Sequence, residues 1–237
     1  MTQRNKRTLV VGDIHGNYKA LLQVLERSNY NPKEDMLIFL GDYCDGGSET
    51  REVIDCLIKL NEEATHKPVF LLGNHDVWLY KYLEVGVELL IWIKNGGQTT
   101  IDSYKHTSFE TKFKHLKFLE KCLNFYFKDD KFYVHGGFKN IEDPIKNQSD
   151  QDYLWDRTLW ELACKSPKNT KFTEFDEIFI GHTTTEILNT THPVNKCNIW
   201  NLDTGAGWKG RLTVMCVETK EYWQSDLTQE LYPERKY

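Results

Sequence analysis

Residues 8–16 read Thr-Leu-Val-Val-Gly-Asp-Ile-His-Gly, a short apolar run that stops at a glycine and passes directly into an acid and an imidazole. A β-branched run of this length is typical of a buried strand. Asp13 and His15 offer an oxygen and a nitrogen to a metal ion, and the flanking glycines permit a tight turn. The stretch therefore predicts a strand that ends in candidate metal ligands.

The same pattern, an apolar run followed by ligand-type residues, recurs four more times along the chain. The runs are 36–40 before Gly41-Asp42-Tyr43-Cys44-Asp45-Gly46-Gly47, 69–72 before Gly73-Asn74-His75-Asp76, 132–134 before His135-Gly136-Gly137, and 178–180 before Gly181-His182-Thr183. The first three motifs lie about 30 residues apart, the length of one strand-helix-strand unit. Because the carboxyl ends of parallel strands meet at one edge of a sheet, the five loops are expected to converge.

Hydrophobic periodicity predicts the secondary structure of the segments between and after these runs. Helices are predicted at 18–27 and 48–60, with Ser48 as the cap of the second. Residues 77–127 are expected to be mostly helical with a break at Gly96-Gly97. Three late runs read as strands able to build a second sheet: 199–202, 212–217 and 221–223. No repeat or linker is visible, which predicts a single domain over 1–237 with a core at about 8–217 and short polar tails.

Composition narrows the classes of function. Hydrophobic residues make up 40% of the chain and charged residues 27%, which excludes disorder of the whole. The formal net charge of −5 disfavours binding to duplex nucleic acid, and no apolar run approaches the length of a membrane helix. The six cysteines are scattered without a Cys-x-x-Cys pair, which predicts reduced thiols, a cytoplasmic location and no thiolate metal site.

The residues at the ends of the runs are all oxygen and nitrogen donors. They are Asp13, His15, Asp42, Asn74, His135 and His182. Such a set suits Mn, Fe or Zn in a site with open positions. Six donors exceed what one open catalytic ion needs, so one carboxylate shared between two ions is the natural arrangement. Two ions of this kind hold a hydroxide and clamp phosphate oxygens, which makes phosphoester hydrolysis the leading chemistry.

Taken in this order, the five motifs resemble those of the phosphoprotein phosphatases within the calcineurin-like metallophosphoesterases. The resemblance spans about residues 8–217 and implies an α/β fold of two facing mixed β-sheets flanked by α-helices. It implies two divalent ions, Mn in the first place with Fe or Zn as alternatives. Asp13 and His15 would bind the first ion, Asp42 would bridge, and Asn74, His135 and His182 would bind the second.

The resemblance also separates catalytic roles that spacing leaves open. His75 would be the general acid and Asp45 the carboxylate that orients it, although from the residues alone His75 equally fits a seventh ligand. Asn74 would also contact the substrate. The family has Glu where this chain has Asp76.

Position 46 departs from the family pattern. The family carries a phosphate-gripping Arg there, and this chain has Gly46. Arg157, in Trp155-Asp156-Arg157, matches the segment from which small bacterial and phage members supply a second such Arg, and we predict that it anchors the substrate phosphate. The alternative for Arg157 is a surface ion pair with Asp156.

Three further residues belong to a stretch, 201–213, that resembles one shared by small bacterial phosphatases and symmetrical dinucleoside tetraphosphate hydrolases. Asp203 is expected to stabilise a tight turn, whereas Lys209 and Arg211 stay open between a turn and a phosphate contact. Histidines outside the motifs are not expected to bind metal, and His115 is expected on an exposed helix among lysines.

The resulting prediction is a metal-dependent phosphoric ester hydrolase that acts on phosphomonoesters through a metal-bridging hydroxide. The leading hypothesis is a serine/threonine protein phosphatase. A symmetrical dinucleoside tetraphosphate hydrolase is the first alternative, and a non-catalytic phosphate-binding module is the second. The expected partner is a phosphorylated protein or a small phosphoester, with neither duplex nucleic acid nor a membrane; the sequence leaves the oligomeric state open.

Overall fold

Two five-stranded mixed sheets face each other in the computed structural model, which describes residues 6–234. The first sheet has the order β10 (Tyr222–Gln224), β9 (Thr213–Cys216), β1 (Thr8–Val11), β2 (Met36–Phe39), β3 (Val69–Phe70). The second has the order β4 (Phe125–Lys128), β5 (Lys131–Val134), β6 (Glu177–Ile180), β8 (Ile199–Asn201), β7 (Val194–Lys196). The predicted α/β fold of two facing mixed sheets flanked by helices is confirmed.

Each sheet combines parallel and antiparallel strand pairs. In the first sheet β1 pairs in parallel with β2 and β2 with the edge strand β3, while β9 is antiparallel to both of its neighbours, β1 and β10. In the second sheet β5, β6 and β8 are parallel, and β4 and β7 close the two edges in antiparallel register. Because parallel strands end on the same side, the loops that follow β1, β2, β3, β5 and β6 are brought to one edge of the molecule.

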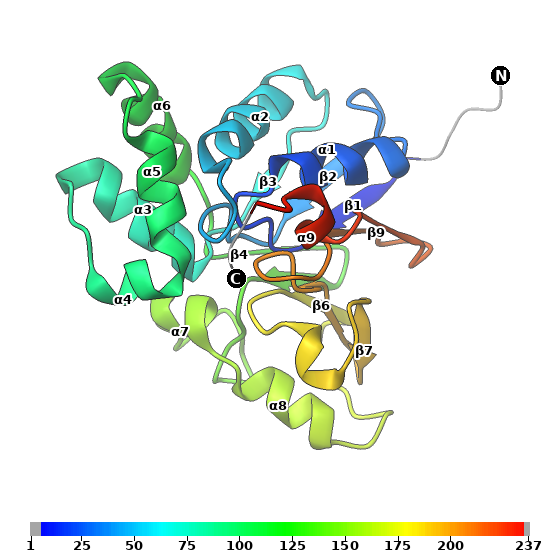
Figure 1. Ribbon diagram of the computed structural model, residues 1–237. Helices are drawn as coiled ribbons and strands as arrows, with labels where there is room; N and C mark the ends of the chain where they lie inside the picture. The colour runs from blue at the N-terminus through cyan, green and yellow to red at the C-terminus, as the bar shows by residue number, and fades with distance from the viewer. Residues whose placement is uncertain (1–5, 235–237) are drawn as a thin grey trace, which may run out of the picture.

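Helices cover the outer face of each sheet, and a further group of helices stands to one side (Figure 1). The helical segments are α1 (Tyr18–Arg27), α2 (Thr50–Glu63), α3 (Asn74–Val85), α4 (Leu90–Trp92), η1 (Ile93–Gly97), α5 (Gln98–Tyr104), α6 (Phe109–Leu119), α7 (Asp150–Trp155), α8 (Thr158–Lys165), η2 (Thr185–Leu188) and α9 (Thr228–Leu231). The segment from α3 to α6 forms the side group, which we call the helical insert.

Alternation along the strands explains the layers. In β1, Leu9 and Val11 pack outward against α1 and α2, whereas Val10 packs inward against the second sheet. Residues of one strand that alternate in this way point to opposite faces. In the second sheet Ile178 and Ile180 pack outward toward α8, while Phe179 points into the layer between the sheets. Burial of both faces fits the almost continuous apolar sequence of these strands.

Several sequence predictions of local structure need correction. Ser48 caps no helix: α2 begins at Thr50, and its N-cap Glu49 makes no side-chain capping bond. The helical stretch expected to reach residue 127 ends earlier, because Phe125–Lys128 forms the edge strand β4. Of the three late strands, only β8 joins the second sheet, and β9 and β10 complete the first.

The prediction that His115 lies on an exposed helix is wrong about the burial of this side chain. It is fully buried, between Tyr104 and Asp55, although it lies on α6 among lysines. The lysines occupy the outer face of this helix, so neighbours in sequence gave no information about the inner face.

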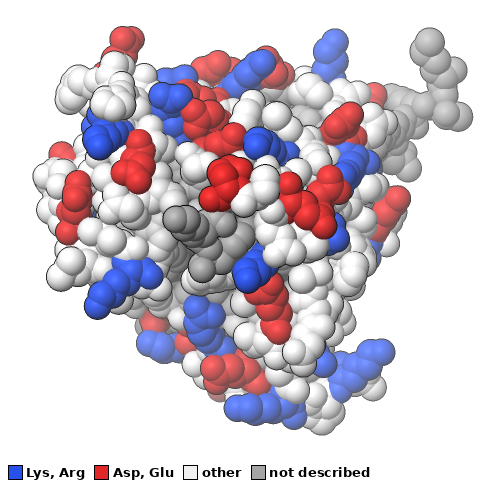
Figure 2. All heavy atoms as spheres, in the orientation of Figure 1, with Lys and Arg blue, Asp and Glu red and all other residues white. Residues whose placement is uncertain are grey.

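Within residues 6–234 no helix combines the length and apolar character needed to cross a bilayer. All six cysteines are free thiols. Basic and acidic side chains are interspersed on the face shown in Figure 2. The N-terminal of the two short polar tails predicted from the sequence lies mostly outside the described residues.

Candidate metal centre

The five motif loops meet around one cavity of about 620 Å³ at the edge where the parallel strands end. Its lining includes four of the six predicted ligands, His15, Asp42, Asn74 and His182, together with His75. Asp13 and His135 are buried beside them. The sequence-predicted donors are therefore brought together, although they come from loops spread over most of the chain.

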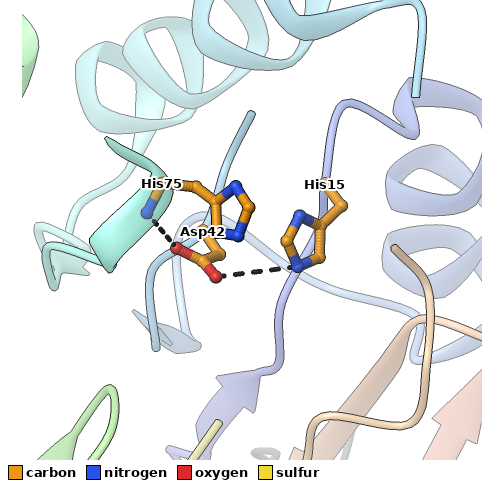
Figure 3. Close-up of side chains that lie close together, drawn as sticks. All are labelled: His15, Asp42 and His75. Carbon is orange, nitrogen blue, oxygen red and sulfur yellow. Dashed lines mark hydrogen bonds and ion pairs between the residues drawn. The ribbon is translucent and has the colours of Figure 1, made fainter. Parts of the chain in front are cut away.

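Asp42 is the hub of this group. Its Oδ1 accepts a hydrogen bond from the backbone N–H of His75 at 2.9 Å, and its Oδ2 lies 3.6 Å from Nε2 of His15 and 3.3 Å from Nε2 of His135. Figure 3 shows this carboxylate linked by dashed lines to the backbone nitrogen of His75 and to the ring of His15. Two clusters of potential ligand atoms share Asp42: one with His15 and His75, the other with His135 and His182.

The main chain fixes which nitrogen of two histidines faces Asp42. Nδ1 of His15 lies 3.0 Å from the carbonyl oxygen of Cys44, and Nδ1 of His135 lies 2.8 Å from that of Leu40. A carbonyl only accepts, so each Nδ1 carries the proton and donates it. In the neutral ring of His15, Nε2 then offers a lone pair toward Asp42, as in metal-ligating histidines whose other nitrogen donates to the protein. Against the effect of burial, the charges of Asp42 and Asp13 raise the pKa of His135 to about 10, so its ring is protonated when no cation is bound.

Two buried ligand atoms have no hydrogen-bond partner among the described residues. They are Oδ1 of Asp13 and Nε2 of His182. The other carboxylate oxygen of Asp13 accepts from the backbone N–H of His182 at 3.0 Å, which ties the two residues together. An unpartnered carboxylate oxygen and an unpartnered imidazole nitrogen are costly to bury, and a bound cation would satisfy both.

The electrostatics of the centre also fit cations. Burial lowers the pKa of His15 to about 4, and burial together with the charges of His135 and Arg157 lowers that of His182 to about 2, so both rings are neutral. Burial and the nearby Asp203 raise the pKa of Asp13 well above its usual range. Metal ions would take the lone pairs of the rings and neutralise the crowded carboxylates. The residues present therefore fit a two-ion centre.

Several site residues hold a left-handed backbone conformation that is uncommon outside glycine. The φ angles are 51° for His15, 51° for Asp42, 73° for Asp45 and 63° for His182. Such conformations persist only where the surroundings enforce them, and they concentrate at functional sites.

Asp76 enforces the conformation of the Asp42 loop. Its carboxylate accepts from the backbone N–H groups of Asp42, Tyr43 and Gly73, at 2.8, 2.8 and 2.9 Å. The residue that departs from the family's Glu is thus buried behind the ligands and joins two of the motif loops.

His75 and Asp45 form a bonded pair at the cavity wall. Nδ1 of His75 lies 2.6 Å from Oδ2 of Asp45. Burial alone would lower the pKa of His75, but the charge of Asp42 and the bond to Asp45 outweigh it, and the pKa is raised. These carboxylates favour the protonated form of the imidazole, and Asp45 occupies its Nδ1.

Two residues that sequence reasoning missed hold Asp45 from the helical insert. Nε1 of Trp92 donates to Oδ2 of Asp45 at 2.7 Å, and the hydroxyl of Thr100 donates to Oδ1 at 2.7 Å. Both side chains are fully buried. The only sequence signal nearby was the Gly96-Gly97 break, which marks where η1 turns toward the Asp45 loop.

Arg157 lies at the mouth of the cavity rather than in an ion pair with Asp156. Its Nη1 donates to the carbonyl oxygen of His182 at 3.0 Å and to the hydroxyl of Thr183 at 2.8 Å. Asp156 instead accepts from the backbone N–H of Leu159, at the start of α8. The geometry thus places a guanidinium beside a predicted ligand.

Gly46 also lines the cavity, with a φ of 80° that favours glycine. Its N–H donates to the carbonyl oxygen of Gly96 at 3.2 Å, so the insert packs directly on this loop.

The stretch 201–213 divides between turn and site. Asp203 accepts from the N–H of Gly205 at 3.1 Å, the turn bond expected from the sequence, but it also lines the cavity and is buried. Burial raises its pKa to about 6. Arg211 is engaged elsewhere, with its Nη1 donating to the carbonyl oxygen of Ser225 at 2.8 Å. Lys209 lies near Glu186, whose pKa it helps to lower against the effect of burial.

A wall of aromatic rings joins the two sides of the cavity. Trp78 contacts the ring of His75 at 5.0 Å between centroids and Trp155 at 5.4 Å, and Trp155 contacts the ring of His182 at 5.9 Å. Trp155 is 40% exposed, and Trp208, which also lines the cavity, is 58% exposed. These rings give the mouth of the cavity an apolar, stackable surface.

Comparison with known proteins agrees with this geometry. A family model described as calcineurin-like phosphoesterase matches residues 6–196. The chain is 40% identical over 72 residues to a symmetrical bis(5'-nucleosyl)-tetraphosphatase of Marinomonas sp., a match that covers 30% of this chain and 25% of that protein. It is 32% identical over 122 residues to serine/threonine-protein phosphatase 2 of Escherichia coli, which covers 48% of this chain and 52% of that protein.

These two matches span only a quarter to about half of the relatives' own length. At the level of fold the likeness extends over nearly the whole chain. The crystal structure of a metallophosphoesterase from Sphaerobacter thermophilus superimposes with a TM-score of 0.56 at 19% identity, over 96% of this chain and 93% of that one.

Proposed function

Because the chain belongs to the calcineurin-like phosphoesterase family, we propose that it hydrolyses phosphomonoesters with the help of two divalent metal ions. One observation carries the proposal: two groups of potential ligand atoms, one with His15 and His75 and the other with His135 and His182, share Asp42. Beside them, buried ligand atoms of Asp13 and His182 have no hydrogen-bond partner within residues 6–234. A centre built in this way needs cations, and it opens onto a cavity large enough for a substrate.

The six predicted ligands would be shared between two ions, with Asp42 bound to both. Asp13 and His15 would hold one ion, Asn74, His135 and His182 the other, and Asp42 both. We propose Mn, with Fe or Zn as alternatives, because the donors are nitrogen and oxygen without sulfur. When bound, such a pair supplies a nucleophilic water at neutral pH and positive charge for the phosphate oxygens.

His75 supplies the proton that the leaving oxygen needs. Its Nδ1 is occupied by Asp45, which leaves Nε2–H as the available acid, and the bond to Asp45 favours the protonated ring. A proton donor beside the departing group is required for poor leaving groups such as a serine alkoxide. The alternative of a non-catalytic phosphate-binding module leaves this pair without a purpose.

Arg157 and Asn74 would contact the transferred phosphate. Both line the cavity, and Arg157 is fixed by its bonds to the His182 carbonyl and to Thr183. A guanidinium held in advance stabilises the extra charge that develops on phosphate oxygens.

We propose a phosphorylated serine or threonine of a protein as the substrate class, which is supported by the similarity to the Escherichia coli serine/threonine-protein phosphatase. A second candidate is a symmetrical dinucleoside tetraphosphate. The exposed Trp155 and Trp208 at the cavity favour it, because indole faces stack on nucleobases.

A substrate panel tests the proposal. Purified protein with added Mn should hydrolyse 4-nitrophenyl phosphate and a phosphoserine peptide, and it should lose that activity in excess chelator. Analysis of the products from a dinucleoside tetraphosphate separates the two candidates: turnover of the tetraphosphate without turnover of the peptide would replace the first by the second. Absence of hydrolysis on all three substrates with Mn, Fe or Zn would contradict the proposed function.

A further inference from the structure

The cavity that holds the candidate metal centre contains two side chains with a permanent positive charge. Among the residues the structure describes, its lining includes Arg157 and Lys94 and no other lysine or arginine. Arg157 lies beside His182, on the side of the second sheet. Lys94 comes from η1 of the helical insert.

The turn that carries Lys94 is fastened to the loop of Asp45, the carboxylate that holds the proposed acid His75. Two residues before Lys94, Trp92 donates to Asp45, and two residues after it, Gly96 accepts from the N–H of Gly46. A Cβ at Gly96 would lie 2.9 Å from the backbone nitrogen of Gly46, so only glycine permits this approach. The backbone of Lys94 is thereby held next to the Asp45–His75 pair.

This placement decides which part of the substrate Lys94 faces. His75 delivers its proton to the leaving oxygen, so the leaving group must lie on the His75 side of the cavity. The insert residues Ile91, Ile93 and Lys94 line that same cavity from the element that supports Asp45. Arg157, beside the ligand His182, is the cation for the transferred phosphate.

We propose that Lys94 binds a negatively charged group on the leaving-group side of the substrate, so that the protein prefers phosphoesters or phosphoanhydrides whose leaving group is itself an anion. The inference rests on the proposed function, and it assigns Lys94 a part in substrate choice rather than in the chemical step.

The surroundings of Lys94 support this role. Its side chain is exposed, and within residues 6–234 it makes no ion pair. A lysine ammonium on a long flexible stem acts as a point charge that adapts to carboxylate or phosphate alike.

Two sources of such an anion fit the same chemistry. One is the remaining phosphate chain of a nucleoside polyphosphate, and the other is an acidic residue that flanks a phosphoserine. Both place negative charge beyond the scissile bond.

A matched pair of small substrates tests the inference. Phenyl phosphate and 4-carboxyphenyl phosphate differ by one carboxylate on the leaving group. With Mn present, Lys94→Met should lower kcat/KM for the carboxylated substrate by about tenfold and for phenyl phosphate by less than about twofold, as expected for loss of one charge-assisted contact at a partly solvated position. Lys94→Arg should retain most of the preference. Lys81→Met, an exposed lysine of α3 outside the cavity lining, is the control and should change neither substrate.

Binding gives a readout that does not depend on turnover. The dissociation constants of phenylphosphonate and 4-carboxyphenylphosphonate, measured by calorimetry, should differ in the wild type and converge in Lys94→Met. Lack of hydrolysis by the wild type would contradict the proposed function, while the phosphonate pair would still test Lys94. An equal loss on both ligands of a pair, or no loss on either, would overturn the inference.

Parallel assays identify the source of the anion. The rates at which the wild type and Lys94→Met hydrolyse a dinucleoside tetraphosphate and a phosphoserine peptide with flanking acidic residues are compared. The larger loss in the variant marks the source that Lys94 recognises, and no loss on either would contradict the proposal.

Discussion

His75 shows how a single side chain takes its function from its bonds. The residue follows a predicted ligand in sequence, and from the residues alone it fits a metal ligand or an acid. In the structure its Nδ1 is engaged by Asp45 at 2.6 Å, which favours the proposed role as an acid through Nε2. The same carboxylate that fixes the ring also favours its protonated form.

Replacing this ring tests the acid role. His75→Asn should retain the metal content and lower kcat by roughly 10²–10⁴ for substrates with poor leaving groups, the usual contribution of a positioned acid. The loss should shrink for 4-nitrophenyl phosphate, whose leaving group needs no proton. Metal analysis beside the kinetics decides the alternative, because a parallel fall in metal content would make His75 a ligand.

Arg157 is tested in the same way. Arg157→Ala should cost on the order of 2–4 kcal/mol in kcat/KM, the range for removing a preorganised donor from developing charge. Arg27→Ala, on α1 and bonded to Asp226, is a control at an exposed arginine. If kcat/KM of Arg157→Ala stays within about twofold of wild type, the phosphate anchor lies elsewhere.

At the scale of elements, the helical insert is the part that completes the site. α4, η1 and α5 contribute no metal ligand, yet Trp92 and Thr100 supply two of the three side-chain bonds that hold the Asp45 carboxylate. Thr100 also accepts from the backbone N–H of Asp45 at 2.9 Å. The insert therefore fixes the Asp45 carboxylate, the partner of the proposed acid His75, from outside the motif loops.

The hydroxyl of Thr100 should matter more than its shape. Thr100→Val keeps the volume but leaves one oxygen of the buried Asp45 unpaired, so kcat should fall by roughly 10–100-fold with KM little changed, as expected for a lost bond to a charged group. Thr100→Ser should restore kcat to within about threefold. Equal activity of the Val and Ser variants would show that this bond does not position Asp45.

A second junction of the insert gives stability a dependence on pH. His115 on α6 lies 2.6 Å from the hydroxyl of Tyr104 and 3.1 Å from a carboxylate oxygen of Asp55, and burial lowers its pKa below 6.5. The unfolded chain takes up a proton as pH falls through 6.5, whereas the folded chain does not until its lower pKa is reached. This residue therefore lowers the free energy of unfolding as pH falls below 6.5.

The effect is isolated by comparison with His115→Gln. Denaturant unfolding at pH 7.5 and pH 5.5 should show that the stability advantage of the wild type over this variant shrinks at the lower pH, since the variant has no imidazole to titrate. An advantage that grows at pH 5.5 would mean that folding raises the pKa of His115 instead.

At the scale of the whole molecule, the sequence predicted those features that depend on residues close together in the chain. The strand ends and the residues beyond them follow from apolar runs closed by glycine, and α1 occupies the predicted residues 18–27. The destination of β9 and β10 was not predictable in this way, because β9 joins the first sheet by pairing with β1, some 200 residues away, and β10 pairs only with β9 among the described strands.

The same distinction between local and long-range information applies to the site. The six predicted ligands are gathered at one cavity, whose composition the motifs anticipated. Asp76, Trp92 and Thr100 were missed, because their contribution is a hydrogen bond to a residue more than 30 positions away and carries no local signal. Asp203 was assigned only to its turn, since nothing in its own loop reveals that the loop packs against Asp13.

The sharing of Asp42 between two ions is the claim on which the whole molecule's proposed chemistry depends, and metal analysis of one variant tests it. The wild type should bind two Mn ions per chain and hydrolyse 4-nitrophenyl phosphate. Asp42→Asn should lose both ions and the activity together, because one carboxylate serves both positions. Asp102→Asn, an exposed carboxylate on α5, should retain both ions. An Asp42→Asn variant that still binds two ions and turns over at the wild-type rate would contradict the two-ion account.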